Sequence, residues 1–343
     1  MSDRVMQLNE AINEAIAQEM ERDSSVVVFG EDVESFGGGG GVFGVTKGLK
    51  EKFGERVKDT PMVEAAIVGA ALGSAITGLR PIAEIMFVDF IGCAMDQILN
   101  QLAKTRYMFG GSMKVPAVIR CPSGSRWPVS CGAAQHSQSL EAFFMHIPGL
   151  KVVAPSMPFD AKGLMISAIR DDNPVIFIEH KLTYYAKRSL TLRDSYKTLL
   201  QHVPPEDFTI PIGAAEIKRE GNDVTIVATM MMVHKALKAA EELSKEGIEA
   251  EIVDPRTLVP LDTETIIQSI KKTSKAVVVT EETKTASTAA EIGMVIMEQG
   301  FDFLDAPVIR VCAPDAPIPH STVLEGAIIP QESDIVRVVR SIV

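Results

Sequence analysis

The chain has 343 residues, 46% of them hydrophobic and 23% charged, which predicts a globular protein of two domains. Its net charge of −11 argues against nucleic acid or an anionic membrane as the main partner, and no stretch reaches the roughly 20 apolar residues of a membrane span. The four cysteines are scattered, so we expect free thiols in a reducing, cytoplasmic setting.

The first half of the chain alternates between helical patterns and short β-branched runs. It opens on an acid-rich amphipathic helix within residues 1–23, which resembles neither a signal peptide nor a transit peptide. Strands are predicted at Val26–Gly30, Arg80–Met86, Ala117–Cys121, Lys151–Ala154 and Val175–Glu179. Helices are predicted at Val45–Phe53, Val63–Thr77, Phe90–Tyr107, Ser139–Met145 and Ala161–Arg170. This alternation predicts a domain of residues 1–181 with a parallel sheet covered by helices on both faces.

The alternation breaks at residues 182–213, where Tyr184, Tyr185, several charges and three prolines indicate a linker. A second alternating set follows. Strands are predicted at Val224–Ala228, Ile248–Val253, Ala276–Thr280 and Val308–Val311. Helices are predicted at His234–Lys245, Thr263–Lys271 and Ala286–Glu298. Residues 214–343 are therefore expected to form a second α/β domain, so that the whole chain comprises two doubly wound domains.

The segment Asp59–Gly78 places one acidic side chain at the mouth of an otherwise apolar helix. Thr60 is expected to cap this helix and Pro61 to occupy its first turn. The small and apolar residues that follow are typical of a helix packed tightly on its neighbours. Glu64 is either a structural charge at the helix start or a functional carboxylate, and spacing alone leaves both readings open.

A glycine-rich stretch gives a weak nucleotide-binding signal. Gly39, Gly41 and Gly44 satisfy G-x-G-x-x-G, but they overlap the five-glycine run Gly37–Gly41 and do not directly follow the preceding strand. A surface or interface loop is the favoured interpretation. The sequence contains neither a G-x-x-x-x-G-K-[ST] motif nor an H-E-x-x-H motif, so NTPase and zinc-protease chemistry lack support.

Two further residues are candidates for chemistry. His136 lies between a Gly-, Ser- and Pro-rich loop and an amphipathic helix, where an imidazole can move protons or only hydrogen-bond a neighbour. Phe90 begins a helix after a strand, and core packing is its alternative role. Together with Glu64, these residues lie at strand-to-helix junctions, which gather at one edge of a parallel sheet. A carboxylate, a ring and an imidazole there would suit a flat heteroaromatic cofactor.

Long motifs that carry a family resemblance are spread over essentially the whole chain. They are DTPMVEAAIVGAALG, RPIAEIMFVDF, RYMFGG, AAQHSQSLEAFF, HIPGLKVVAPSMPFDAKGL, RDDNPVIFIEHK, IEAEIVDPRTLVPLD and DAPVIRVCAPDAPIP. They resemble the β subunit of thiamine-diphosphate-dependent 2-oxo acid dehydrogenases. Within the family, GGVFGVTKGL, RYMFGG and PIGAAEIKREGNDVTIVA look closest to acetoin dehydrogenase, with the pyruvate and branched-chain enzymes next. The resemblance implies a transketolase-like pyrimidine-binding domain followed by a transketolase C-terminal-like domain.

The resemblance also implies an α₂β₂ heterotetramer with each active site at an α–β interface. The α subunit would hold the diphosphate through Mg²⁺ with a GDG-containing motif, which this sequence lacks. By position, Glu64 matches the glutamate that bonds the pyrimidine nitrogen N1′ and thereby promotes deprotonation of the thiazolium. Phe90 matches the ring that stacks on the pyrimidine, and Met62 matches an apolar wall beside it. His136 matches a histidine on the substrate side, where it helps proton transfer or handles the lipoyl group.

Some relatives hold a structural K⁺ ion largely through backbone carbonyls, and sequence can scarcely test such ligands. By position they would fall on Ala117, Ala168, Ile169, Asp171 and Asn173. Trp127, Pro128 and the long glycine run depart from the family pattern. These departures bear on the substrate more than on the cofactor.

The resulting prediction is the β subunit of an acetoin or 2-oxo acid dehydrogenase, active only with an α subunit. It would cleave a C–C bond of a small-molecule substrate and pass the acyl group to a lipoyl arm on the acyltransferase core. A pyruvate dehydrogenase β subunit is the alternative substrate assignment. A non-catalytic α/β assembly scaffold is the alternative from a different class, and the missing GDG motif counts against a self-sufficient transketolase-like transferase.

Overall fold

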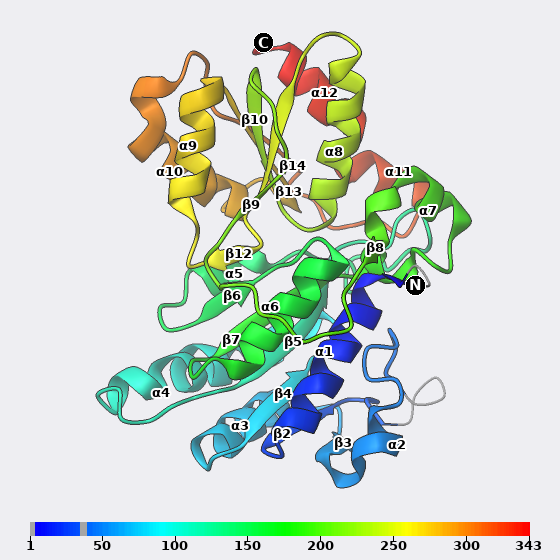
Figure 1. The fold of residues 1–343 in the computed structure, drawn as a ribbon, viewed down its shortest axis with the longest axis vertical. Helices are drawn as coiled ribbons and strands as arrows, with labels where there is room; N and C mark the ends of the chain where they lie inside the picture. The colour runs from blue at the N-terminus through cyan, green and yellow to red at the C-terminus, as the bar shows by residue number, and fades with distance from the viewer. Residues whose placement is uncertain (1–3, 35–39) are drawn as a thin grey trace.

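The computed structural model describes residues 4–34 and 40–343, and it confirms an α/β fold built on two main sheets (Figure 1). The glycines Gly37, Gly38 and Gly39 of the predicted loop lie outside the described residues. Among the described residues, no helix is long and apolar enough to cross a membrane.

The first sheet has seven strands in the order β12-β6-β7-β5-β4-β2-β3. Their bounds are β2 (Val26–Gly30), β3 (Val57–Asp59), β4 (Arg80–Glu84), β5 (Val118–Ser123), β6 (Lys151–Val153), β7 (Val175–His180) and β12 (Thr257–Val259). All neighbours run parallel except β12, which pairs antiparallel with β6. Because β12 comes from far along the chain, this edge strand connects the second half of the protein to the first sheet.

Helices cover both faces of this sheet, as the alternating pattern predicts. On one face, α1 (Leu8–Arg22), α2 (Leu49–Phe53) and α6 (Pro158–Arg170) enclose one apolar core. On the other face, the core lies under α3 (Glu64–Ile76), α5 (Glu141–Met145) and a continuous helical stretch of residues 88–108. That stretch changes its winding from the 3₁₀ segment η2 (Val88–Ala94) through the π-helical η3 (Gln97–Leu102) to α4 (Ala103–Met108). The predicted helix at Val45–Phe53 is shortened because Gly48, with a φ of 78°, immediately precedes its first turn.

The segment predicted as a linker holds short elements of its own. They are η4 (Lys181–Tyr185), α7 (Leu190–Ser195), η5 (Lys197–Leu199) and β8 (Gln201–His202). Strand β8 pairs antiparallel with β1 (Val5–Met6), near the start of the described chain. This pairing fixes the connecting segment to the N-terminal part of the protein.

The second sheet has five strands in the order β14-β13-β10-β11-β9. Their bounds are β9 (Glu216–Arg219), β10 (Val224–Ala228), β11 (Ala250–Asp254), β13 (Ala276–Thr283) and β14 (Ile309–Ala313). All pairs are parallel except β9 with β11. Helices α8 (Met231–Ser244) and α12 (Glu332–Arg340) share one core, and α9 (Thr263–Thr273) and α10 (Thr288–Gly300) share the other. Two short helices, η6 (Phe301–Phe303) and α11 (Thr322–Ile328), lie on either side of β14 along the chain.

His234 on α8 joins three parts of the chain. Its Nε2 lies 2.9 Å from the Ser156 carbonyl oxygen beyond β6, and its Nδ1 lies 2.7 Å from the Thr198 hydroxyl in the connecting segment. This arrangement fits a neutral ring that donates to the carbonyl and accepts from the hydroxyl. The side chain is buried, and burial lowers the pKa of His234 to about 4.

The free energy of unfolding is therefore expected to fall as the pH drops from 6.5 to 4. In this window the unfolded chain binds a proton at His234 and the folded chain does not, so the loss attributable to this residue is about 3 kcal/mol. Urea unfolding at both pH values, for the wild type and for His234→Asn, isolates the effect because the other titrating groups are shared. Equal losses in the two proteins would show that His234 is not the titrating group.

Candidate active site

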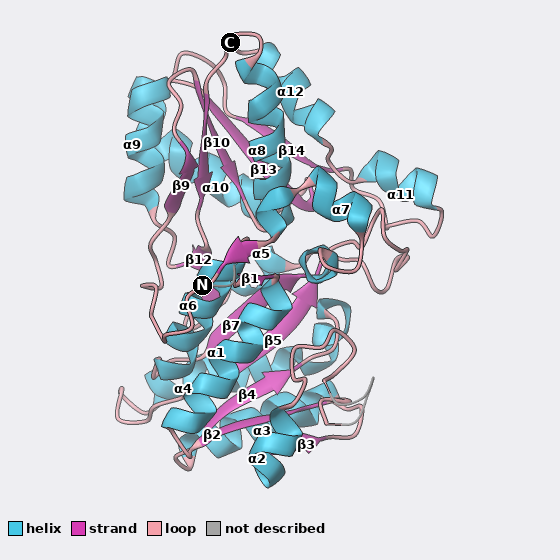
Figure 2. Cartoon of the chain, turned by 45° about the vertical axis from the view of Figure 1, so that its right-hand side comes forward, coloured by secondary structure: helices cyan, strands magenta, loops and turns pink. Residues whose placement is uncertain are grey.

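Strands β5, β4, β2 and β3 are adjacent and parallel, so their carboxyl ends lie along the same side of the first sheet (Figure 2). The candidate residues follow these strand ends. Glu64 follows β3, Glu31 follows β2, Phe90 follows β4, and His136 follows β5. Loops and helix starts at such an edge are the usual ligand-binding region of a parallel α/β sheet. The predicted convergence at strand-to-helix junctions therefore has a structural basis in the strand order.

Glu64 is the first residue of α3, but the expected cap is wrong. Val63 precedes the helix and offers no polar side chain, while the backbone N–H of Thr60 donates to the Gly30 carbonyl at 2.9 Å and so prolongs the pairing of β3 with β2. The chain turns only afterwards, where the Val63 N–H donates to the Pro61 carbonyl at 2.8 Å. Glu64 therefore lies in the first turn of α3, where the unpaired backbone N–H groups and the helix dipole favour a carboxylate.

Helix α3 is buried on one face and exposed on the other, whereas its composition predicts a helix packed tightly on its neighbours. The residues of the buried face are Ile67, Val68, Ala71 and Ala75. The exposed positions are Ala66, Ala70, Gly73 and Ile76. Met62, just before the helix, is 74% exposed. An apolar surface of this kind next to a candidate site is typical of a face that another molecule covers.

Glu31 lies near Glu64 at the same edge, and sequence reasoning did not single it out. Burial raises the pKa of Glu31, and the negative charges of Asp32 and Glu64 raise it further. The signal was present in the sequence, because Glu31 directly follows a buried parallel strand. The carboxylates of Glu31 and Glu64, which follow the neighbouring strands β2 and β3, therefore lie close enough to influence each other's charge.

Phe90 and His136 are in direct contact. Their ring centroids lie 5.4 Å apart at an interplanar angle of 87°. The Phe87 ring packs edge-on against both, at 4.9 Å from His136 and 5.8 Å from Phe90. The imidazole is therefore positioned by aromatic contacts, and its direction depends on the path of the loop that carries it.

The loop after His136 is held by the buried carboxylate of Asp89, which follows β4. Asp89 Oδ1 accepts hydrogen bonds from the backbone N and from Nε2 of Gln138, both at 3.0 Å. Lys181, fully buried beyond β7, places its Nζ 3.8 Å from Asp89 Oδ2 and 5.1 Å from the Phe87 ring centroid. Burial lowers the pKa of Lys181 to about 8. Sequence reasoning missed this lysine because nothing in its neighbourhood along the chain predicts its burial.

Comparisons with known proteins identify the family of the chain. Residues 4–187 match the family model of the transketolase pyrimidine binding domain, and residues 213–335 match that of the transketolase C-terminal domain. The "Acetoin:2,6-dichlorophenolindophenol oxidoreductase subunit beta" of Cupriavidus necator is 49% identical over 98% of this chain and 97% of its own length. The "Pyruvate dehydrogenase E1 component subunit beta" of Bacillus subtilis is 44% identical over 98% of both chains.

This chain belongs to the family of β subunits of thiamine-diphosphate-dependent 2-oxo acid dehydrogenases. Among solved structures, a "Split gene transketolase, inactive beta4 tetramer" aligns with a TM-score of 0.75 at 24% sequence identity, over 97% of each chain. That similarity concerns the fold alone. The two family models and the two relatives confirm the family resemblance seen in the sequence motifs.

The residues of this β subunit fit the aminopyrimidine half of thiamine diphosphate. Glu64 offers a carboxylate at a helix start, Phe90 offers a ring whose neighbours fix its orientation, and Met62 offers an exposed apolar side chain. These groups match the polar edge and flat faces of a heteroaromatic ring. Within residues 4–34 and 40–343, no group of three or more His, Cys, Asp or Glu residues is placed to hold a metal ion.

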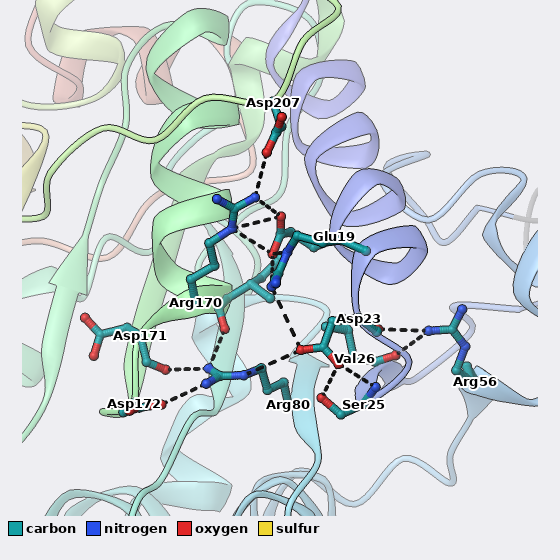
Figure 3. Close-up of polar contacts among 12 residues, drawn as sticks. Glu19, Asp23, Ser25, Val26, Arg56, Arg80, Arg170, Asp171, Asp172 and Asp207 are labelled. Carbon is teal, nitrogen blue, oxygen red and sulfur yellow. Dashed lines mark hydrogen bonds and ion pairs between the residues drawn. The ribbon is translucent and has the colours of Figure 1, made fainter.

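The carbonyls expected to hold K⁺ are already engaged with groups of the protein. Arg80 Nη1 donates to the carbonyl of Ile169 at 2.9 Å and to that of Asp171 at 3.1 Å, as Figure 3 shows for Arg80 and Asp171. The Ala168 carbonyl accepts from the backbone N–H of Asp171 at 3.3 Å, and the Ala117 carbonyl accepts from a neighbouring strand.

Asn173 is also held by protein groups, because its backbone N and Nδ2 both donate to Asp171 Oδ1 at 2.8 Å. Its own Oδ1 accepts from Arg106 Nη1 at 2.9 Å. A potassium ion at these carbonyls would meet the guanidinium of Arg80, and like charges at such distances repel. In this arrangement the residues do not fit K⁺, and no part of the chemistry below depends on it.

Proposed function

We propose that this β subunit supplies one half of each active site in an α₂β₂ dehydrogenase component that acts on acetoin. The observation that carries the proposal is the convergence of Glu64 with the Phe90–His136 pair at one sheet edge, beside an exposed apolar surface. The more similar of the relatives described above is an acetoin enzyme, which supports the choice of substrate.

The Glu64 carboxylate shares a proton with the pyrimidine nitrogen N1′. Its place in the first turn of α3 keeps the carboxylate fixed by the helix, and the exposed Met62 beside it excludes water from one side of the ring. Phe90 stacks on the pyrimidine and fixes its plane. When bound, thiamine diphosphate supplies the nucleophilic carbon that attacks the substrate carbonyl and permits cleavage of the C–C bond.

His136 faces the substrate side and moves a proton to or from the substrate or the lipoyl sulfur. An imidazole suits this task because its pKa is normally close to neutral pH. The Phe87 and Phe90 rings restrict its orientation, which lowers the entropy cost of reaching a reactive geometry.

The remaining half of the site comes from an α subunit, which binds the diphosphate through Mg²⁺. The absence of a GDG motif from this sequence supports that division of labour. The exposed face of α3, with small side chains at Ala66, Ala70 and Gly73, allows another helix to approach closely. A lipoyl arm on an acyltransferase core then accepts the acyl group.

A substrate panel tests the assignment to acetoin. The β subunit is mixed with its α subunit, thiamine diphosphate and Mg²⁺, and reduction of an artificial electron acceptor is followed with acetoin, pyruvate and branched 2-oxo acids. We expect kcat/KM to be at least about tenfold higher for acetoin. A higher value for pyruvate would establish the pyruvate dehydrogenase alternative, and no turnover with any substrate would favour the scaffold.

A further inference from the structure

The loop that carries His136 is attached to both halves of the molecule. It leaves β5 at Ser123 and reaches α5 at Glu141. Near its start, Ser125 Oγ donates to Glu325 Oε1 on α11, and the Ser125 N–H donates to Glu281 Oε1 on β13, both at 2.6 Å. All three of these side chains are buried. The beginning of the loop is thus fixed to the C-terminal half of the chain.

Trp127 adds an apolar contact to this attachment. It packs with Val129 against the core under α8 and α12, and its ring lies so near Gly326 of α11 that a Cβ there would come within 2.7 Å of ring atoms. Lys235 Nζ lies 5.8 Å from the ring centroid, at a cation–π distance, and donates to the Pro330 carbonyl at 2.6 Å. We call the contact between Trp127 and Gly326 the tryptophan clamp.

The clamp is connected to His136 by a short and tightly folded stretch of chain. The N–H groups of Val129 and Ser130 both donate to the Arg126 carbonyl, at 2.8 and 3.1 Å, so the clamp residue sits within a closed turn. Gly132 follows and lies against the backbone of His136, where a Cβ would come within 2.7 Å of the His136 carbonyl oxygen. Few residues and close backbone contacts thus separate Trp127 from His136.

The opposite end of the loop is held by the N-terminal half of the chain through the two hydrogen bonds from Gln138 to Asp89. His136 thus lies between an anchor on each half of the molecule. Its imidazole is oriented by packing against Phe87 and Phe90, so the path of the backbone between the anchors sets where the ring nitrogens point.

We propose that Trp127 is a positioning residue for His136 and that Gly326 leaves the space that the Trp127 ring needs against α11, which we call its socket. Packing of the C-terminal half against the loop then aligns the imidazole for acyl transfer. The inference rests on the proposed role of His136. It also gives a role to Trp127, which the sequence analysis singled out as unexpected for the family.

Two variants disturb the clamp from opposite sides. Trp127→Ala removes the ring. Gly326→Ala leaves the loop sequence intact but places a methyl group in the space that the ring occupies. Because alanine is a better helix former than glycine, a loss of function in this variant is not explained by a weaker α11 helix. Gly293→Ala on α10 is the matched control, because a Cβ there meets its nearest atom at an ordinary 3.8 Å. Trp127→Phe keeps a ring in the socket and serves as the conservative variant.

In the mixed α₂β₂ enzyme, we expect Trp127→Ala and Gly326→Ala each to lower lipoyl-dependent kcat about tenfold, while the Kd of thiamine diphosphate changes less than about twofold. Trp127→Phe should restore most of the rate, and Gly293→Ala should match the wild type. Because the clamp acts through His136, Trp127→Ala should cause no further loss in a His136→Ala background. Losses that multiply in the double variant, or an unchanged kcat in both clamp variants, would overturn the proposal.

Amide hydrogen exchange separates this inference from the proposed function. Residues 124–138 of the full chain should exchange faster in Trp127→Ala and Gly326→Ala than in the wild type and in Gly293→Ala. Trp127 is the single tryptophan, so a shift of its emission in Gly326→Ala reports movement of the clamp itself. Unchanged exchange and emission would refute the clamp even in an active enzyme. Faster exchange in a chain that shows no thiamine-diphosphate-dependent turnover would support the clamp and reject the proposed function.

Discussion

Glu64→Gln is expected to lower turnover of the mixed α₂β₂ enzyme by at least about 100-fold without preventing assembly. The amide has nearly the size of the carboxylate and remains at the first turn of α3, so packing is preserved. It cannot share a proton with the pyrimidine nitrogen as a carboxylate does, and cofactor activation depends on that proton. Turnover with an artificial acceptor and the sedimentation behaviour of the mixture measure the two effects separately.

Glu264→Gln supplies the matched control for the structural reading of Glu64. Glu264 lies in the first turn of α9 and is exposed, so it experiences a helix dipole without the candidate site. A purely structural charge at a helix start contributes about 0.3–1 kcal/mol. If Glu64 were only such a charge, both variants would lose a little stability and keep their turnover. Near-normal turnover of Glu64→Gln would therefore remove Glu64 from the chemistry.

Arg120→Met is expected to cost about 3–5 kcal/mol of unfolding free energy, the largest stability effect we anticipate for a single residue. Arg120 on β5 is 1% exposed and donates two parallel hydrogen bonds to Glu179, each 2.6 Å long, and one to Glu84. The Tyr184 hydroxyl also donates to Glu179. Methionine fills much of the space but leaves two buried carboxylates without a cation.

The location of this cluster connects stability to the site. Glu84 ends β4, just before the segment that carries Phe87 and Phe90, and burial raises the pKa of the Glu84 carboxyl. Arg337→Met is the control, because Arg337 pairs with Asp334 on the surface of α12 and such pairs contribute at most about 1 kcal/mol. Urea unfolding of both variants measures the difference. A loss no larger for Arg120→Met than for Arg337→Met would contradict the account of a buried ion cluster.

The sequence predicted those parts of the fold that depend on local patterns. Strands β2 and β10 were predicted at their observed bounds, because buried parallel strands are continuous runs of β-branched and small residues. The edge strand β12 could not be predicted in this way. It is three residues long and exists only because residues far apart in the chain pair with β6. The Thr60 cap failed for the same reason, since pairing with β2 holds Thr60 in the sheet.

The candidate site was predictable to the extent that it lies at strand ends. The sequence pattern placed Glu64, Phe90 and His136 after the ends of parallel strands, as the structure has them, and the motifs supplied the roles proposed for them. Lys181 was not predictable, because its burial against Asp89 and Phe87 depends on how distant segments pack. The expected potassium site was carried over by position, and only the structure shows that Arg80 donates to two of its carbonyls.

The most direct test of the central claim, that this chain contributes half of an active site, is a titration of the α subunit into a fixed amount of the β subunit. Thiamine diphosphate, Mg²⁺, acetoin and an artificial electron acceptor are present throughout. The account predicts no turnover from either chain alone and a rate that rises to a plateau at equimolar amounts. Turnover by the β subunit alone, or none at any ratio with acetoin, pyruvate or branched 2-oxo acids, would contradict it.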